Sequence, residues 1–185
     1  ATLAVDALGA VRVHAAVMPS PWSSQETQQD ARDLCSNLGI ECFDLPIEPA
    51  MDAYDRMLSG VPEGPGLALA NENIQARIRG NLLMALSNRH GWLVVTTGNK
   101  SELAVGYSTL YGDAAGGFGL LKDVPKHLVY ELAELRNRRG DSPIPRSILT
   151  RAPSAELRPG QKDADSLPPY DVLDEILRLH VEERM

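Results

Sequence analysis

Short apolar runs alternate along the chain with segments of helical periodicity. Three runs stand out, at 11–18, 40–47 and 92–97, and each is followed by a segment with apolar residues at helical spacing. Runs of four to eight apolar residues bounded by turn signals are typical of strands buried in a parallel sheet. Strands that alternate with helices in this order predict an α/β fold with a parallel sheet.

Start and stop residues mark the helices between these runs. Ser23 or Ser24 is positioned to cap the second helix and Gly39 to end it. The first helix has no capping residue ahead of Ala1, so we expect its beginning to lie upstream. The predicted helices cover 1–9, 24–38, 49–58, 69–89, 101–110, 125–138 and 170–183.

Three segments lack regular patterning. Residues 59–66 and 112–119 are rich in glycine, and we interpret them as a flexible connector and a turn. Six prolines between 141 and 169 predict an extended arm or a disordered loop. Because 185 residues fit one domain of about 100–200 residues, we predict one domain over 1–185 with 141–169 as this arm.

Charge and composition narrow the class of partner. The formal net charge is −7, and no basic run exceeds Arg138–Arg139, which argues against nucleic-acid binding and favours a small ligand. No apolar run approaches the roughly 18 residues of a membrane helix. The spacing of Cys35 and Cys42 fits neither a metal knuckle nor a disulfide framework. We therefore expect a cytoplasmic protein that binds no membrane.

The segment TTGNKSE follows the clearest strand, at 92–97. Ligands of open α/β sheets bind beyond the carboxyl ends of the strands. Thr97 offers a hydroxyl, Lys100 can meet a phosphate, and Glu102 can hold a hard cation such as Mg²⁺. The alternative is that Asn99 and Ser101 simply cap a helix, and the local pattern does not decide between the two.

Two other places carry candidate binding residues. Asn73 and Arg77 share one face of the predicted helix 69–89, where Arg77 can clamp a phosphate or carboxylate; the alternative is a solvated stripe. Lys126 begins a helix, where the dipole disfavours cations unless an anion shares the spot; the alternative is an ordinary surface lysine. No Ser/His/Asp or Cys/His arrangement or metal-ligand spacing of histidines occurs, so no catalytic side chain is assigned.

The stretches NENIQARIRGNLLMALSNRHGWLVVTTGNKSELAVGYSTLYGDAAGGFGLLKDVPK and RAPSAELRPGQKDADSLPPYDVLDEIL resemble the synthetase domain of glutamine-dependent NAD synthetases. The similarity runs from VDALGA and the loop VMPSPWSS to the final helix. It implies the Rossmann-like fold of the N-type ATP pyrophosphatases. It also implies a two-step reaction in which ATP adenylates the nicotinate carboxylate of deamido-NAD, and ammonia, free or from glutamine, then displaces AMP to give NAD.

Site residues follow from this resemblance position by position. The implied contacts are ATP at Thr97, Lys126 and Ser154; Mg²⁺ at Glu102; and deamido-NAD at Asn73, Arg77, Glu102 and Tyr107.

The sequence departs from the family in what it lacks. Family members carry a phosphate loop of the type SGGxDS before the helix that ends in ATLAVDALGA, and a glutaminase domain, and neither is found in residues 1–185. Neither Cys35 nor Cys42 is therefore assigned as an amidase nucleophile. Loss of the loop's strand predicts an open sheet edge, self-association as a homo-oligomer, and an inactive chain. The alternative is a non-catalytic nucleotide-binding module of the same fold.

Overall fold

A computed structural model describes all 185 residues and divides the chain into two compact units. Unit 1 consists of Ala1–Glu48 and Tyr130–Lys162, and unit 2 consists of Pro49–Val129 and Asp163–Met185. Each unit therefore combines segments that are far apart in the sequence. No helix combines the length and the hydropathy needed to cross a membrane.

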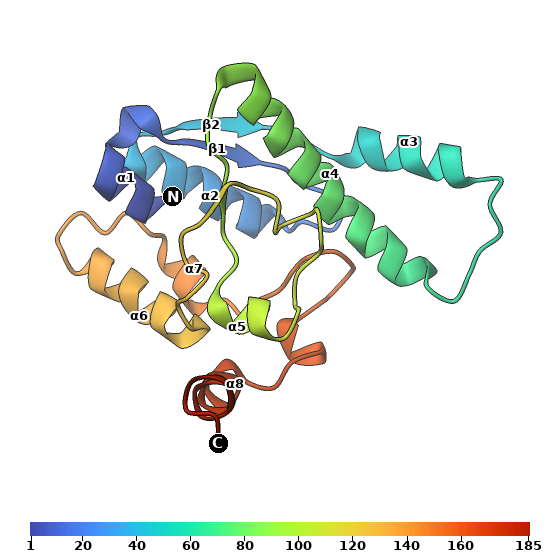
Figure 1. The fold of residues 1–185 in the computed structure, drawn as a ribbon. Coiled ribbons are helices and arrows are strands. Elements are labelled where there is room, and N and C mark those ends of the chain that lie inside the picture. The colour runs from blue at the N-terminus through green and yellow to red at the C-terminus, as the bar shows by residue number, and fades with distance from the viewer. The chain divides into compact units, whose positions relative to one another are not determined.

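Unit 1 is built on a pair of parallel strands (Figure 1). β1 and β2 pair from His14 opposite Glu41 to Val17 opposite Asp44, and α2 connects them. Its elements are α1 (Thr2–Leu8), a 3₁₀ turn (Ala10–Arg12), β1 (His14–Val17), α2 (Gln25–Leu38), β2 (Glu41–Asp44), the later part of α6 (Lys126–Asn137), and α7 (Arg146–Thr150).

The core of unit 1 lies between α2 and the strands. Cys35, Leu38 and Ile40 are buried, and apolar side chains from α1, β1 and β2 pack against them. Ser24 fixes the start of α2 by accepting a hydrogen bond from Thr27 N at 3.1 Å. Gly39 ends the helix in the left-handed conformation, with φ of 64°. Both ends of this helix are where the sequence predicts them.

Unit 2 contains a second pair of parallel strands and the long helix of the molecule. β3 and β4 pair with Val95 opposite Phe118 and Thr96 opposite Gly119. Its elements are α3 (Glu48–Leu58) from its second residue on, α4 (Leu67–His90), β3 (Val95–Thr96), α5 (Lys100–Ala104), β4 (Phe118–Gly119), the start of α6, a 3₁₀ turn (Asp163–Asp165), α8 (Tyr170–Leu177), and a π-helical turn (Arg178–Glu182).

The parallel pairing of β3 with β4 determines where the next helices begin. The chain leaves β3 into α5 and leaves β4, through a short turn, into α6. Because both strands run in the same direction, their carboxyl ends meet at one edge of the sheet. The backbone bond from Lys100 N to Val124 O, 3.0 Å long, joins the two connections directly.

Helix α4 and the loop that follows α5 approach each other backbone to backbone. A Cβ on Gly80 would lie 2.8 Å from the carbonyl oxygen of Gly112, and a Cβ on Gly112 would lie 2.8 Å from the Cβ of Ala76. Both distances are shorter than real carbon contacts, so only glycine fits at these positions. The loop is thereby held against the face of α4 that carries Asn73 and Arg77.

Several predicted elements are shorter in the structure than the sequence pattern indicates. The strands expected at 11–18 and 40–47 cover only His14–Val17 and Glu41–Asp44, and a 3₁₀ turn takes up the start of the first run. The expected strand at 92–97 pairs only over Val95–Thr96, because Trp92 N donates to Ser87 O at 3.1 Å and Ser87 Oγ donates to Trp92 O at 2.6 Å. The first half of the run therefore completes the end of α4. The expected helix at 101–110 ends at Ala104, beyond which Gly106 takes a positive φ of 69°.

Two other predictions missed regular structure. The turn expected at 112–119 contains β4, and the proline-rich segment 141–169 contains α7. Asn137 orders the start of that segment by exchanging hydrogen bonds with Ile144 N and Ile144 O, and Asn37 donates to Pro143 O at 3.0 Å. Side-chain amides thus supply the partners that proline-rich backbone cannot find in a sheet or helix. The prediction of one domain over 1–185 and that of self-association stay predictions.

The close approach of α4 and the loop after α5 predicts that a larger residue at Gly112 destabilises the fold. We expect Gly112→Ala to lower the free energy of unfolding by about 1–3 kcal/mol, because the new methyl group overlaps Ala76 and Thr109. Chemical denaturation measures the change. Gly60→Ala is the matched control: no atom lies within 4 Å of its added Cβ, and the substitution should be neutral or stabilising by less than about 1 kcal/mol. Equal effects from the two substitutions would contradict the close approach.

Candidate functional site

The start of α5 is fixed by reciprocal capping directly after β3. Asn99 Oδ1 accepts a hydrogen bond from Glu102 N at 3.0 Å, and Glu102 Oε2 accepts one from Asn99 N at 3.3 Å. This capping box satisfies two backbone groups that a helix start leaves without partners. Asn99 is buried, with 3% of its surface exposed. The capping interpretation of TTGNKSE is therefore confirmed for Asn99 but not for Ser101, whose hydroxyl bonds to Lys126 N of α6. The capping box also holds the Glu102 side chain in one place.

Glu102 faces Lys126 across the gap between α5 and α6. Lys126 Nζ lies 2.7 Å from Glu102 Oε1, and the two side chains are 17% and 19% exposed. The Lys126 ammonium also lies 5.2 Å from the centre of the Tyr170 ring, within the range of a cation–π interaction. The resemblance assigns both Glu102 and Lys126 to the ATP and Mg²⁺ site, and the structure brings them into direct contact.

A buried pair of side chains caps α6. Ser101 Oγ accepts a hydrogen bond from Lys126 N at 2.8 Å and donates one to Asp174 Oδ1. Asp174 Oδ2 accepts from His127 N at 2.9 Å and lies 2.7 Å from His127 Nδ1. Ser101 is fully buried and Asp174 is 5% exposed. These contacts satisfy the first N–H groups of α6 from inside the protein.

The hydrogen bonds at Asp174 outweigh its burial. Burial raises the pKa of this carboxyl, but the bonds from His127 N–H, Ser101 Oγ–H and the His127 ring favour the charged form, and the resulting pKa lies below the ordinary value. Asp174 is therefore an anion at neutral pH. The sequence predicts an anion beside Lys126 at the start of α6. In the structure the Asp174 carboxylate is such an anion, and it belongs to the protein itself and not to a ligand.

Tyr170, the first residue of α8, is half-buried and bonds to the buried carboxylate of Asp163. Tyr170 donates a hydrogen bond to Asp163 Oδ2 at 2.7 Å, and Tyr107 donates to Asp163 Oδ1 at 3.1 Å. Burial, followed by the neighbouring carboxylate of Asp163, raises the pKa of the Tyr170 phenol well above its usual range. The phenol therefore stays protonated as a donor. Tyr107, which the resemblance places at the dinucleotide groove, is tied here to the segment before α8.

Asn73 and Arg77 hold the loop that packs on α4. Asn73 Oδ1 accepts a hydrogen bond from Thr109 Oγ1 at 2.8 Å, and Arg77 Nε donates to Leu110 O at 3.2 Å. Arg77 is exposed, and this bond involves Nε alone among its guanidinium nitrogens. Its fork can therefore still reach an anionic group in solvent.

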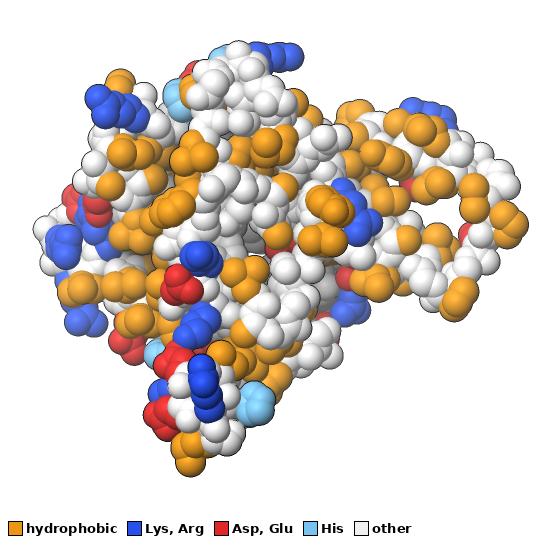
Figure 2. Space-filling model, in the orientation of Figure 1, with side chains coloured by type: hydrophobic (Ala, Val, Ile, Leu, Met, Phe, Trp, Pro, Cys, Tyr) orange, Lys and Arg blue, Asp and Glu red, His pale blue; other side chains and the backbone are white.

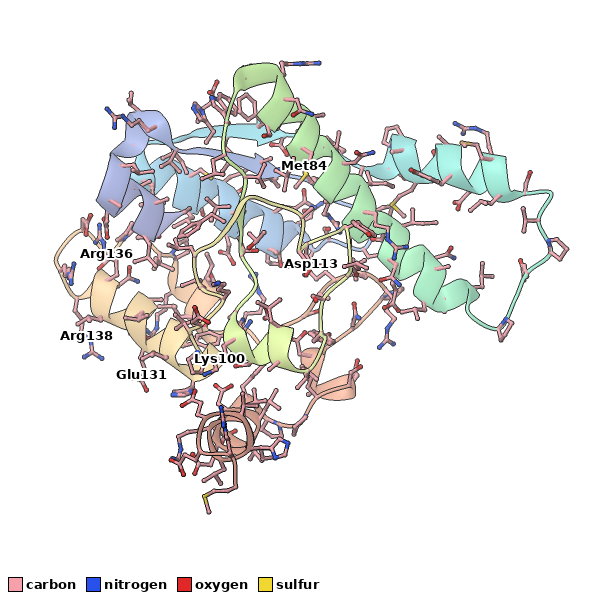
Figure 3. All side chains as sticks on the ribbon, in the orientation of Figure 1. Met84, Lys100, Asp113, Glu131, Arg136 and Arg138 are labelled. Carbon is pink, nitrogen blue, oxygen red and sulfur yellow. The ribbon has the colours of Figure 1, made fainter.

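A small pocket lies at the carboxyl ends of β3 and β4. Its volume is about 240 Å³, below the roughly 300–1,000 Å³ of a typical small-molecule site. Asp113, labelled in Figure 3, belongs to its lining and also accepts a hydrogen bond from Thr109 N at 2.7 Å. Thr96, Gly98, Leu103, Gly119 and Lys122 also line it. The pocket is therefore smaller than a typical small-molecule site.

The remaining predicted residues lie at separate places. Thr97 is exposed directly after β3. Ser154 lies in unit 1, where its hydroxyl donates to Gln161 O at 2.6 Å and accepts from Glu156 N at 3.1 Å. Ser154 therefore stabilises the turn of its own loop.

Glu102 is the predicted Mg²⁺ ligand, and both its oxygens have protein partners. Oε1 contacts Lys126, and Oε2 accepts from Asn99 N. No group of three or more His, Cys, Asp or Glu side chains is arranged to hold a metal ion. One carboxylate is nevertheless in keeping with Mg²⁺, which is usually bound by one or two carboxylates together with substrate phosphates and water.

Sequence reasoning missed the contribution of α8. Tyr170, Leu173, Asp174 and Leu177 fall on one helical face, and an aspartate in an otherwise apolar stripe is the signal that was available. A buried carboxylate needs partners, so this pattern indicates a polar contact inside the protein. Its partners, Ser101 and His127, come from other helices and cannot be read from the pattern. Acidic and basic side chains lie close together over α8 at the bottom of Figure 2.

Comparison with known proteins gives consistent matches. The family model described as NAD synthase matches residues 1–185. A glutamine-dependent NAD(+) synthetase of Thermotoga maritima is 54% identical over 184 residues, covering 99% of this chain and 32% of the relative. The chain thus spans about a third of the length of the curated relatives it matches.

Solved structures agree with this match. The glutamine-dependent NAD+ synthetase of Acinetobacter baumannii in complex with ADP is 43% identical with a TM-score of 0.75, covering 100% of this chain and 32% of that one. The NMN synthetase of Francisella tularensis is 31% identical with a TM-score of 0.85, covering 96% of this chain and 70% of that one.

The depressed pKa of Asp174 predicts a dependence of stability on pH. Because the folded-state pKa lies below the unfolded value near 3.9, the stabilisation is complete above that value and is lost as pH falls through the folded-state pKa. We expect Asp174→Asn to lower the free energy of unfolding by about 1–3 kcal/mol at pH 7, and this difference from the unsubstituted protein to shrink below about pH 4.

Denaturation at pH 7, 5, 4 and 3 measures this difference. Asp171→Asn, an exposed aspartate on the same helix, is the control and should change stability by less than about 1 kcal/mol. A difference for Asp174→Asn that stays constant down to pH 3 would show that its charge is not what stabilises the fold.

Proposed function

Because the chain belongs to the NAD synthase family, we propose that the complete gene product is a carbon–nitrogen ligase that converts deamido-NAD to NAD with ATP. The fold is the α/β fold of the N-type ATP pyrophosphatases found in its structural neighbours. The observation that carries the proposal is the contact between Lys126 and Glu102 at the carboxyl ends of β3 and β4.

The reaction consists of two displacements. A nicotinate carboxylate oxygen attacks the α-phosphorus of ATP, the bond to the β-phosphate oxygen breaks, and pyrophosphate leaves. Ammonia then attacks the acyl carbon, AMP leaves with the former carboxylate oxygen, and a proton is released as the amide forms. Both steps bring negative groups together, so the protein's main task is to neutralise charge and to orient the reactants.

Lys126 contacts the phosphates of ATP in this proposal. Its ammonium is held by Glu102 and by the Tyr170 ring, and it sits at the helix start that follows β4. Glu102 can exchange its bond to Lys126 for a bond to Mg²⁺, which when bound supplies positive charge to the triphosphate. Thr97 and Ser154 contribute hydroxyl contacts to ATP.

Arg77 and Asn73 bind deamido-NAD from α4. The exposed guanidinium of Arg77 suits a phosphate or carboxylate, and Asn73 lies one helical turn away on the same face. Tyr107 lines the same groove. The loop 107–112, which these residues hold through Thr109 and Leu110, brings the α4 face and α5 into one unit.

The remaining parts of the proposal concern the complete gene product. Ammonia is supplied free or by a glutaminase domain, and the protein forms a homo-oligomer. It works in the cytoplasm, in keeping with the free thiols of Cys35 and Cys42.

We expect Lys126→Ala in the complete gene product to lower kcat/KM for ATP by about a hundredfold or more, because an ammonium that meets the developing charge is lost. Production of NAD from deamido-NAD, ATP and ammonia, followed with varied ATP, measures this. Arg138→Ala is the matched control: Arg138 is an exposed basic residue just beyond the end of α6, labelled in Figure 3. It should leave the rate within twofold.

An unchanged kcat/KM for ATP in Lys126→Ala would show that this lysine does not contact the phosphates of ATP. Nucleotide binding without any amide formation by the complete gene product would instead favour the non-catalytic module. The structural neighbours include an NMN synthetase. The deamidated form of NMN is therefore assayed as an alternative substrate beside deamido-NAD, and we expect a higher kcat/KM for deamido-NAD.

Residues 1–185 alone are expected to form no NAD under the same conditions. The reason is that they cover only about a third of the relatives and lack an SGGxDS loop for the pyrophosphate. The complete gene product assayed in parallel is the positive control. Turnover by residues 1–185 above the no-enzyme rate would overturn this part of the proposal.

A further inference from the structure

Lys126 is contacted from below by one face of α8. Tyr170 and Asp174 are four residues apart and therefore share a face of this helix. Tyr170 places its ring 5.2 Å from the Lys126 ammonium, whereas Asp174 reaches the backbone at the start of α6. One helix thus contacts the ammonium of Lys126 directly through Tyr170 and reaches the Lys126 N–H indirectly, through Asp174 and Ser101. This helix lies more than forty residues later in the chain.

The Asp174 contacts form a closed set around the start of α6. Its Oδ1 accepts from Ser101, whose hydroxyl oxygen accepts from Lys126 N, and its Oδ2 accepts from His127 N. The carboxylate therefore holds two consecutive N–H groups of α6, one directly and one through Ser101. Rotation or withdrawal of the helix start would break several bonds at once and leave a buried charge without partners.

The same set extends to the carboxylate that faces Lys126. Ser101 is the residue before Glu102 in the first turn of α5, and Asn99 fixes the Glu102 side chain through the capping box. Asp174 therefore sets the distance between the first turns of α5 and α6, which carry Glu102 and Lys126. The ion pair with Glu102 contacts only the ammonium end of Lys126, whereas the bond from Lys126 N to Ser101 Oγ holds its backbone.

We propose that Asp174 is a positioning residue, which acts through Ser101 and the backbone of Lys126 to aim the Lys126 ammonium at the phosphates of ATP. This inference rests on the proposed function of Lys126. It predicts that a change at Asp174 impairs the use of ATP specifically. The α4 residues proposed to bind deamido-NAD, Asn73 and Arg77, form hydrogen bonds with Thr109 and Leu110 and with none of the Asp174 partners.

Asp174→Asn in the complete gene product is the main test. Asparagine keeps the shape, but its single oxygen and its amide group cannot accept from Ser101 and His127 together. A misplacement on the order of 1 Å can lower a rate by about a hundredfold, so we expect KM for ATP to rise at least about tenfold while KM for deamido-NAD stays within twofold. Asp171→Asn, on the exposed face of α8, is the control and should leave both values unchanged.

A double-mutant cycle with Lys126→Ala distinguishes positioning from general stability. If Asp174 acts through Lys126, adding Asp174→Asn to Lys126→Ala will change kcat/KM for ATP less than twofold. Additive losses, or equal losses for ATP and deamido-NAD, would overturn the inference and leave Asp174 with a structural role. If Asp174→Asn does not fold, Ser101→Ala, which removes only the hydroxyl between Asp174 and Lys126 N, is judged by the same criteria.

The cycle also separates this inference from the proposed function. A Lys126→Ala variant with unchanged kcat/KM for ATP would refute the role of Lys126, and the inference with it. A strong effect of Lys126→Ala together with unchanged kinetics in both Asp174→Asn and Ser101→Ala would refute the inference alone.

Discussion

Helix α6 begins with backbone N–H groups that have no partners inside the helix, and a buried carboxylate and a buried hydroxyl supply them. Ser101 and Asp174 come from α5 and α8, so the satisfaction of one helix start joins three helices of unit 2. The side chains of Ser101 and Asp174 are buried from water, so leaving either without its partners would be costly. The orientation of Lys126 and its distance from Glu102 follow from this junction.

A second constraint acts where the loop after α5 packs on α4. Gly80 and Gly112 let the loop after α5 lie directly on α4, and Asn73 and Arg77 then hold that loop by hydrogen bonds. Since the loop continues directly from α5, the α4 face and the ion pair of Lys126 are linked through covalent chain and close packing. Two candidate subsites are thereby held in fixed relation within unit 2, without a large apolar core between them.

The elements with strong periodicity and clear end signals were predictable. Helices α2, α3 and α4 lie within two residues of the predicted bounds, because caps such as Ser24 and Gly39 act locally. The lengths of the short strands β3 and β4 were not predictable. They depend on the pairing of the two strands with each other and on competition from the end of α4. Local sequence does not contain that information.

The candidate site likewise contains residues that could be predicted from the sequence and residues that could not. Glu102 and Lys126 were identified from a motif and a family resemblance, and their contact follows once β3 and β4 are parallel. Asp174 was not identified, although its place on an apolar stripe was visible in the sequence. Its role depends on Ser101 and His127, which are 73 and 47 residues away. Contacts of such separation arise from tertiary structure alone.

Charge balance bears on the proposed nucleotide site. The chain has a net charge of −7, and both Lys100 and Lys126 are paired with glutamates. In the proposed function, the nucleotide would arrive with a divalent cation that adds positive charge. Glu102 would then hold the cation, and Lys126 would contact a phosphate. Both side chains are more than four-fifths buried, at 17% and 19% exposed, so each charge would need its new partner when the pair separates. The exchange needs Lys126 to stay in place once Glu102 has released it. Glu102 cannot provide that restraint, and the fixed start of α6 can.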